Sequence, residues 1–312
     1  MIDLSGPSQP WPEAADRLWA GCAGDAVRGR EEGGDLLRAE LSSVFGLDPR
    51  HVTITPGARV AALAYGLAAG PVALERPTFT GVSAVLSAAR VPWTYVPWPE
   101  IGDVRPGTLL WVTSPCRNPD GARIEDDVLA RFLGAGGRVV VNATNVWFDD
   151  EPLPAVPGAE IVVSLHKLAG REARIAFVHS PRFAEEAADL LPGLTPSARW
   201  QHTWALFIRR GGLDLLRARV SDMLKAREEF AAELGAYQVG GAGPNVLLRL
   251  RPGAGEEAAA ALLLARGFKV VEGRHFASPV PAVRANFSGV PAREAARFAR
   301  VLRATGLLDG WP

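Results

Sequence analysis

Short apolar runs rich in β-branched residues alternate with Ala- and Leu-rich stretches through the first two thirds of the chain. The runs are too short for helices and end in turn residues such as Pro56-Gly57, so they predict strands. These strands are expected at 52–55, 71–74, 94–96, 108–112, 138–141 and 161–164. The stretches between them predict helices at 58–69, 80–90 and 124–135. Strands that are apolar on both faces and separated by helices predict an α/β fold with a mostly parallel sheet covered by helices.

The pattern changes after about residue 205. Residues 204–234 form one long helical stretch rich in Leu, Arg and Glu, and a glycine-rich break at 240–244 follows it. Beyond that break, strands are expected at 245–250, 268–272 and 282–287, and helices at 254–266 and 291–304. This mixture predicts a small α+β domain, which the long helix connects to the large α/β domain.

We therefore divide the chain into an N-terminal arm (1–25), a large α/β domain (26–205), and a connector helix with a small α+β C-terminal domain (206–312). Residues 1 to about 20 carry three prolines and two tryptophans. Proline fixes its own φ and restricts the residue before it. We expect this arm to be extended and to pack against the protein rather than to form a helix.

Composition narrows the function. The 312 residues carry 34 basic and 34 acidic side chains, and this zero formal charge argues against binding nucleic acid or an anionic membrane. Two cysteines, Cys22 and Cys116, cannot form a disulfide framework, and no Cys/His cluster has zinc-site spacing, so no metal is expected. We find no secretory signal and no membrane-spanning stretch, and therefore expect a cytoplasmic protein.

Only three of the 34 basic residues are lysines: Lys167, Lys225 and Lys269. Lys167 directly follows the apolar strand at 161–164, and ligands of α/β sheets bind at the carboxyl ends of strands. A lysine there can have a lowered pKa and form a Schiff base with a carbonyl. Ser164 before it and Arg174 after it offer a hydroxyl and a guanidinium to a phosphate. The alternative is a surface lysine at a strand end.

Further candidates stand at other strand ends. Gly57, Ala58 and Arg59 lie where a strand turns into a helix, and the free N–H groups of such a turn favour an anion, although a plain Pro-Gly turn is equally compatible. Asn118 lies in an Asn-Pro-Asp-Gly turn that would fix its side chain at the mouth of the sheet. Arg284, in the last strand of the small domain, could bind a carboxylate bidentately.

Taken together, these segments resemble the fold-type I PLP-dependent aminotransferases, closest to the alliinase and tryptophan-aminotransferase branch. The resemblance runs from about residue 40 to 305. It implies pyridoxal 5'-phosphate as cofactor, an α-amino acid or keto acid as substrate, and a homodimer with the site near the subunit interface. It also implies Lys167 as the Schiff-base lysine and Arg284 as the residue that holds the substrate's α-carboxylate.

The resemblance further assigns cofactor contacts along the chain. The phosphate is assigned to the turn at 57–59 with Ser164 and Arg174. The segment Pro77-Thr78-Phe79 supplies the ring that stacks on the cofactor, and Asn118 reaches its phenolic oxygen. The full set of expected cofactor residues is Gly57, Ala58, Arg59, Phe79, Asn118, Asn142, Asn145, Ser164 and Arg174.

The chain also departs from the family pattern. Asn142 stands where the family has an Asp that pairs with the pyridine nitrogen, so it can hydrogen-bond this nitrogen but offers no negative charge. Asn145 replaces a Tyr that contacts the phenolic oxygen, and His166 replaces the usual Ser before the lysine. The pair Cys116-Arg117 lengthens the turn before Asn118.

The resemblance implies an aminotransferase, in which Arg284 would orient the substrate and Lys167 would carry the α-proton. Two alternatives stay open. One is a PLP-dependent lyase that performs alliinase-like β- or γ-elimination, and the other is a degenerate, non-catalytic family member.

Overall fold

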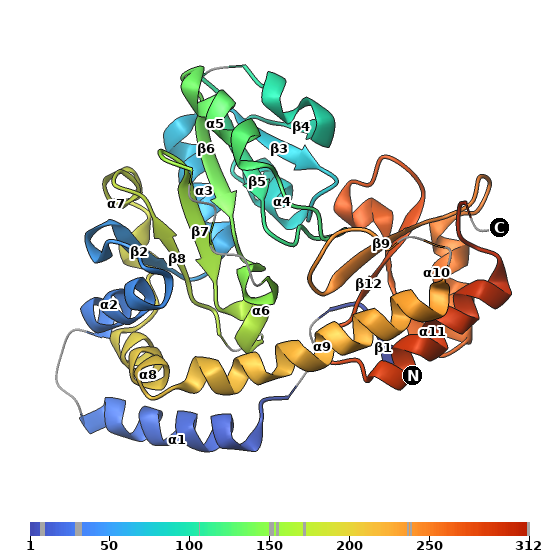
Figure 1. Cartoon of the computed structure of the whole chain (residues 1–312). Coiled ribbons are helices and arrows are strands. Elements are labelled where there is room, and N and C mark those ends of the chain that lie inside the picture. The colour runs from blue at the N-terminus through green and yellow to red at the C-terminus, as the bar shows by residue number, and fades with distance from the viewer. Residues whose placement is uncertain are drawn as a thin grey trace.

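The computed structural model describes residues 1–6, 10–28, 33–105, 107–149, 153, 156–170, 173–235, 237 and 239–310. Its centre is a seven-stranded sheet in the order β2-β8-β7-β6-β5-β3-β4 (Figure 1). The strands are β2 (Val52–Thr55), β3 (Val72–Arg76), β4 (Trp93–Pro97), β5 (Leu109–Thr113), β6 (Arg138–Asn142), β7 (Glu160–Ser164) and β8 (Ala176–His179). Neighbours from β4 to β7 pair in parallel, whereas β8 is antiparallel to β7 and β2. The predicted α/β fold with a mostly parallel sheet is confirmed.

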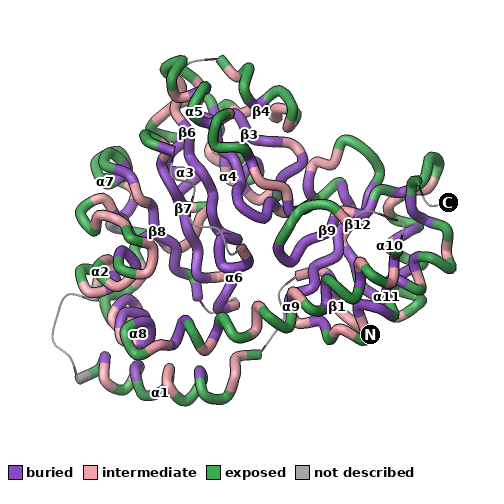
Figure 2. The backbone as a smooth tube through the Cα atoms, viewed as in Figure 1, coloured by how far each residue is buried: buried purple, intermediate pink, exposed green. Residues whose placement is uncertain are grey.

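Helices cover both faces of this sheet, as the strands with two apolar faces predict. Successive residues of a strand point to opposite faces. In β6, Val140 packs in one hydrophobic cluster, whereas Val139 and Val141 pack in another on the opposite face. The first face carries α3 (Ala58–Ala69), α4 (Gly81–Ala88) and α7 (Phe183–Glu186), and the second carries α2 (Gly33–Phe45), α5 (Asp126–Gly134) and α8 (Ala198–Arg209). Except for the edge strand β4, the strands are consequently buried along most of their length (Figure 2).

The C-terminal part is a smaller antiparallel sheet in the order β11-β12-β9, packed beside two helices (Figure 1). Its elements are β9 (Asn245–Arg249), α10 (Glu256–Ala265), β11 (Val271–Glu272), β12 (Ala282–Asn286) and α11 (Ala292–Thr305). The N-terminal strand β1 (Ile2–Asp3) pairs in parallel with β10 (Phe268–Lys269). The first residues of the chain therefore pack on the C-terminal part of the protein.

The predicted single helix over 204–234 is wrong. Two helices occupy this stretch, α8 and α9 (Gly212–Leu234), because Gly211 between them adopts a left-handed conformation with φ of 81°. Glycine adopts this conformation without steric cost, and it ends a helix. The strand expected at 268–272 is likewise two short strands, β10 and β11, which pair with different partners.

The prediction of an extended N-terminal arm is also wrong for most of its length. Residues 13–28 form α1 (Glu13–Arg28), while residues 7–9 lie outside the described residues. Ala15, Cys22 and Ala26 are buried in α1, with the half-buried Trp19 on the same helix face, and this spacing is helical. The prolines before residue 13 suit the start of a helix, where a proline is tolerated. The prediction was wrong because it took them as evidence for an extended segment.

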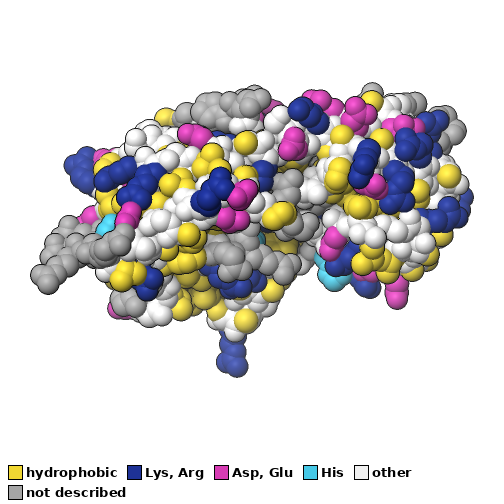
Figure 3. All heavy atoms as spheres, turned by 90° about the horizontal axis from the view of Figure 1, so that it is seen from below, with side chains coloured by type: hydrophobic (Ala, Val, Ile, Leu, Met, Phe, Trp, Pro, Cys, Tyr) yellow, Lys and Arg dark blue, Asp and Glu magenta, His cyan; other side chains and the backbone are white. Residues whose placement is uncertain are grey.

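The surface carries charges of both signs, as the equal numbers of basic and acidic residues lead us to expect. Basic and acidic side chains lie beside one another over much of the face shown in Figure 3. None of the helices in the described part of the chain has the length and apolar character needed to cross a bilayer.

Candidate active site

Three adjacent parallel strands end at one edge of the large sheet, and a candidate residue stands at each end. Asn142 is the last residue of β6, and its register partner Thr113 is the last residue of β5. The Asn118 turn follows Thr113, and Lys167 follows Ser164 at the end of β7. The sheet therefore brings together residues that are up to 49 positions apart in the sequence (118 to 167).

Lys167 lies on a one-turn helix, α6 (His166–Ala169), which begins immediately after β7. Burial, together with the positive charges of Arg284 and Arg59, lowers the pKa of Lys167 to about 8. A lysine with a lowered pKa has a larger share of unprotonated amine near neutral pH than an ordinary lysine has. The structure thus links three residues that the sequence predicts for the site: Lys167, Arg284 from β12, and Arg59 from the start of α3.

Arg284 is a buried cation with only 6% of its surface exposed. Its guanidinium donates to the backbone oxygen of Ser5 at 3.0 Å and to Oδ1 of Asn245 at 3.4 Å, and it stands 4.7 Å from the ring centre of Phe276. Burial lowers its pKa to about 10. Within the described part of the chain no carboxylate pairs with it, and its Nε has no hydrogen-bond partner. A buried arginine in this state suits a carboxylate ligand.

Two amide oxygens at the sheet edge are buried without a partner among the described residues: Oδ1 of Asn142 and Oδ1 of Asn118. The other end of the Asn142 amide is held, since Nδ2 donates to Oγ1 of Thr113 at 3.3 Å. A buried polar atom without a partner costs about 1–3 kcal/mol, so such atoms indicate a site whose ligand supplies the missing group.

Asn145 has a different environment. Its Nδ2 donates to the backbone oxygen of Cys116 at 2.7 Å, and the residue is buried. This bond holds the lengthened turn between β5 and Asn118. A contact between Asn145 and a cofactor stays a prediction.

The residues expected around a phosphate lie at the starts and ends of their elements. Gly57 precedes α3 with φ of 130°, which favours glycine, and the first N–H groups of a helix have no partner within it. Ser164 is buried, and its Oγ accepts the N–H of His166 at 3.3 Å. Arg174 is exposed just before β8, beside the end of β7.

Phe79 lies in the loop between β3 and α4 and is 45% exposed. Its ring lies against Gly81, where an added Cβ would come within 2.2 Å of a ring carbon. The loop also contacts the C-terminal part of the protein, since the N–H of Thr78 donates to the backbone oxygen of Phe276, between β11 and β12, at 2.8 Å. Phe79 is therefore held in place while nearly half of its surface stays exposed, and its stacking on a cofactor stays a prediction.

Several residues of the site were not predicted. Glu75 is fully buried and accepts the N–H of Thr113 at 3.0 Å and Oγ1 of Thr78 at 2.8 Å, while burial raises its pKa. It ties the Phe79 loop to the end of β5. The signal that could have pointed to it was a carboxylate directly after the apolar run 71–74, at the carboxyl end of a predicted strand.

A second unpredicted contact joins the glycine-rich loop at 240–243 to the Asn118 turn. Arg227 of α9 donates to the backbone oxygens of Gly240 at 2.6 Å, Gly241 at 2.7 Å and Gly243 at 2.8 Å. The N–H of Ala242 in turn donates to the backbone oxygen of Gly121 at 2.8 Å. The loop at 240–243, which Arg227 of α9 holds, thus supports the turn that carries Asn118.

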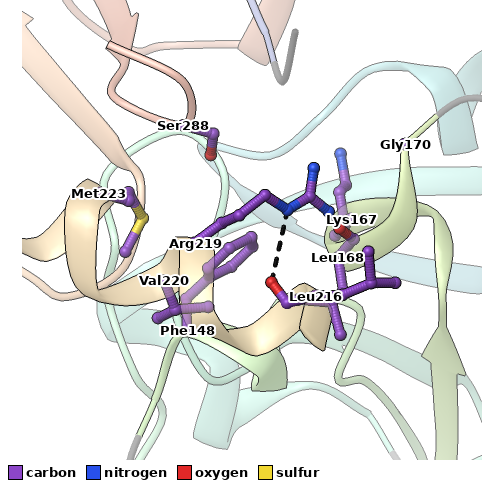
Figure 4. A pocket seen from close by; sticks show the side chains of 9 residues that line it. All are labelled: Phe148, Lys167, Leu168, Gly170, Leu216, Arg219, Val220, Met223 and Ser288. Carbon is purple, nitrogen blue, oxygen red and sulfur yellow. Dashed lines mark hydrogen bonds between the residues drawn. The ribbon is translucent and has the colours of Figure 1, made fainter. Parts of the chain in front are cut away.

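A pocket opens beside Lys167 (Figure 4). Lys167, Leu168 and Gly170 line it from the Lys167 turn, and Leu216, Arg219, Val220 and Met223 line it from α9, together with Phe148 and Ser288. Arg219 from α9 and Lys167 from its own turn both face this pocket. The lining is mostly apolar, so the amine of Lys167 lies in surroundings that favour its uncharged form.

Solved structures share this architecture over almost the whole chain. A multiple substrate aminotransferase from Thermococcus profundus superposes with a TM-score of 0.81 at 18% identity, over 97% of this chain and 90% of its own. An aminotransferase from Mycobacterium tuberculosis gives 0.82 at 17% identity, over 98% and 91%. The α-aminoadipate aminotransferase LysN from Thermus thermophilus, complexed with N-(5'-phosphopyridoxyl)-L-leucine, gives 0.79 at 20% identity, over 97% and 92%.

The chain has the fold of these aminotransferases. No model of a known protein family matches the sequence, and no curated protein matches it. The fold that the sequence resemblance implies is therefore confirmed. Within the aminotransferase fold, the roles of Lys167, Arg284 and the other site residues stay predictions.

Proposed function

We propose that the protein is an aminotransferase that uses pyridoxal 5'-phosphate and acts on an α-amino acid. The observation that carries this proposal is the position of Lys167, whose amine lies at the sheet edge with Arg284 and Arg59 near enough to lower its pKa. No carboxylate among the described residues offsets these charges at Lys167. A site with three cations favours anionic ligands, and a phosphate and a substrate carboxylate are such ligands.

The residues present fit the cofactor. The unpartnered Oδ1 of Asn142 suits a protonated pyridine nitrogen, the amide N–H of Asn118 would donate to the phenolic oxygen, and the amine of Lys167 would hold the aldehyde carbon. The phosphate would be held by the turn at 57–59 with Ser164 and Arg174, and the ring of Phe79 would stack on the cofactor. When bound, pyridoxal 5'-phosphate would supply an electron-accepting ring that stabilises negative charge at the substrate's α-carbon.

The chain's own residues would orient the substrate and move its proton. Arg284 would bind the α-carboxylate through the donors that are not bonded to Ser5 and Asn245, and its rigid surroundings would fix the substrate's orientation. Nζ of Lys167 would then accept the α-proton and return it to another carbon. A pKa of about 8 suits an amine that must both take up and release a proton near neutral pH.

Asn142 distinguishes this site from the family pattern. Its Oδ1 can accept a hydrogen bond from a protonated pyridine nitrogen but adds no negative charge to hold that proton. We infer a weaker electron sink than an Asp would create. Two alternative functions therefore stay open. One is a lyase that eliminates without a keto-acid acceptor, and the other is a protein that binds an amino acid without turning it over. We also propose that the protein belongs to the alliinase and tryptophan-aminotransferase branch.

We further propose a homodimer with the site near the subunit interface. The sequence resemblance supports it, and the exposed positions of Phe79 and Arg174 leave the rim of the site open to a second subunit. Sedimentation of the purified protein would test this separately, since a monomeric species at all concentrations would contradict it.

The proposed function is tested by trapping the cofactor. The protein is incubated with pyridoxal 5'-phosphate, reduced with borohydride and digested, and the three lysine peptides are compared by mass spectrometry. We expect the phosphopyridoxyl group on Lys167 and not on Lys225 or Lys269. Amino acids are then offered with and without a keto-acid acceptor. Acceptor-dependent turnover supports transamination, release of ammonia without acceptor supports elimination, and no labelling of Lys167 would overturn both.

A further inference from the structure

The one-turn helix that carries Lys167 ends in three successive backbone carbonyls, each bonded to a side chain. The oxygen of Leu168 accepts Nη2 of Arg219, and the oxygen of Ala169 accepts Nε1 of Trp11 at 2.6 Å. The oxygen of Gly170 lies 2.8 Å from Nδ1 of His166. The last carbonyls of a helix have no partner within it, so these side chains supply the bonds that the short helix cannot make itself.

The two distant donors come from different parts of the chain. Arg219 lies in α9, and Trp11 lies just before α1, so their bonds to the Lys167 turn span 51 and 158 residues. Arg219 also donates to the backbone oxygen of Pro10 at 3.2 Å. The N-terminal segment and α9 are thus fastened to each other and to the same turn.

The indole of Trp11 is held firmly in position. It stacks on Phe207 with ring centres 5.2 Å apart and meets Trp19 and Trp204 edge-on at 5.6 and 6.0 Å. Aromatic packing of this kind limits the rotation of the ring, so the N–H points steadily at the turn. Arg219 extends along the pocket beside Lys167, and burial lowers its pKa (Figure 4).

The same N-terminal segment contacts the second functional residue. The backbone oxygen of Ser5 accepts a guanidinium hydrogen of Arg284 at 3.0 Å, and the backbone oxygen of Leu4 accepts the N–H of Asn286 at 2.9 Å. Residues near the N-terminus therefore hold both Arg284 and the Lys167 turn, although these belong to different sheets.

We propose that Trp11 and Arg219 are positioning residues, which hold the amine of Lys167 at a defined place in the site by bonding the carbonyls that follow it. This inference rests on the proposed function in one respect, because it takes Lys167 as the reactive amine. The charged side chains that act on this amine are Arg284 from β12 and Arg59 from α3, and Arg219 from α9 lines the same pocket. A loosened turn would let Lys167 move away from them and toward water.

The test uses the three lysines of the chain. The cofactor-free protein is acylated briefly at a series of pH values, and labelling of Lys167 is measured by peptide mass against Lys225 and Lys269 as internal references. In Trp11→Phe, which keeps the ring but loses the N–H, we expect the apparent pKa of Lys167 to rise by about 0.5–1 unit. In Arg219→Gln, which keeps one donor but loses the charge, we expect a rise as well.

A matched control separates positioning from packing. Trp19→Phe alters the same aromatic cluster, although the indole of Trp19 has no bond to the turn among those described. It should leave the Lys167 pKa unchanged even if it lowers the melting temperature as much as Trp11→Phe. Equal pKa values in the wild type, Trp11→Phe and Arg219→Gln would overturn the proposal. Because this labelling needs no cofactor, it can succeed where trapping of pyridoxal 5'-phosphate fails, and the two proposals remain separable.

Discussion

The carboxylate of Glu75 accepts the backbone N–H of Thr113 at 3.0 Å across two adjacent strands. Oγ1 of Thr113 accepts Nδ2 of Asn142 at 3.3 Å, and the same oxygen of Glu75 accepts Oγ1 of Thr78 at 2.8 Å. A continuous chain of hydrogen bonds therefore runs from the Phe79 loop through β5 to the end of β6. It connects the loop expected to stack on the cofactor with the amide expected to face its nitrogen.

Glu75 should make stability depend on pH. Burial raises its pKa in the folded protein, so the folded state binds the proton more tightly than the unfolded state does. The stabilisation is complete below the ordinary glutamate pKa and is lost as pH rises through the raised value. We therefore expect the stability lost in Glu75→Gln, measured as the free energy of unfolding relative to the wild type, to be about 1 kcal/mol larger at pH 5 than at pH 8. Urea unfolding at both pH values measures this.

The control for Glu75→Gln is Glu257→Gln, at an exposed position of α10. Its stability relative to the wild type should be the same at both pH values. If Glu75→Gln also shows no difference between pH 5 and pH 8, the buried carboxyl does not carry the pH dependence.

Replacing Arg284 should affect both substrate binding and Lys167. Arg284→Gln removes the bidentate donor for a carboxylate, and we expect kcat/KM for amino acids to fall by about 100-fold, mostly through KM. Since the charge of Arg284 contributes to the low pKa of Lys167, the loss should raise that pKa, and the alkaline rise in activity should move to higher pH. Steady-state kinetics from pH 6 to 10 measure both effects.

Arg251→Gln, at an exposed position beyond β9, is the control for Arg284→Gln. It should leave KM and the pH profile unchanged. An Arg284→Gln enzyme with wild-type KM would mean that the substrate carboxylate binds elsewhere.

Asn142→Asp tests the weakened electron sink. The carboxylate would hold a proton on the pyridine nitrogen through a charge-assisted bond, which is about twice as strong as a neutral one. We expect turnover to rise by about tenfold, and affinity for pyridoxal 5'-phosphate, followed by absorbance titration, to rise with it. Unchanged turnover and affinity would show that residue 142 does not face the nitrogen.

The ion pair between Arg117 and Asp120 should stabilise the Asn118 turn. Arg117 is buried, bonds Asp120 at 2.5 and 2.8 Å, and stands 3.7 Å from the ring centre of Trp98. Asp120→Asn leaves the guanidinium buried without its counter-charge, and we expect a loss of about 2 kcal/mol in the free energy of unfolding. Asp214→Asn breaks the exposed pair with Arg217 at 3.5 Å and should cost less than about 0.5 kcal/mol. Equal losses in the two variants would contradict this role.

Local patterns along the chain were enough to predict the alternation of elements and the place of Lys167. Six of the seven large-sheet strands were predicted within about two residues of their bounds, because short runs of β-branched, aromatic and aliphatic residues mark them. The seventh, β8, was missed because Ala176–His179 is a short segment with little distinctive pattern. The position of Lys167 at a strand end follows from the order of residues next to it, so the amino-acid sequence alone is sufficient to predict it.

Which distant residues meet depends on the tertiary structure. Ser5 with Arg284, Trp11 with Ala169, and Glu75 with Thr113 are contacts over 279, 158 and 38 residues. Hydrophobic periodicity reports which face of an element is buried, but it carries no information on which distant donor reaches a given carbonyl. That choice depends on how the whole chain closes around its cores, and here it places the N-terminus against both Arg284 and the Lys167 turn.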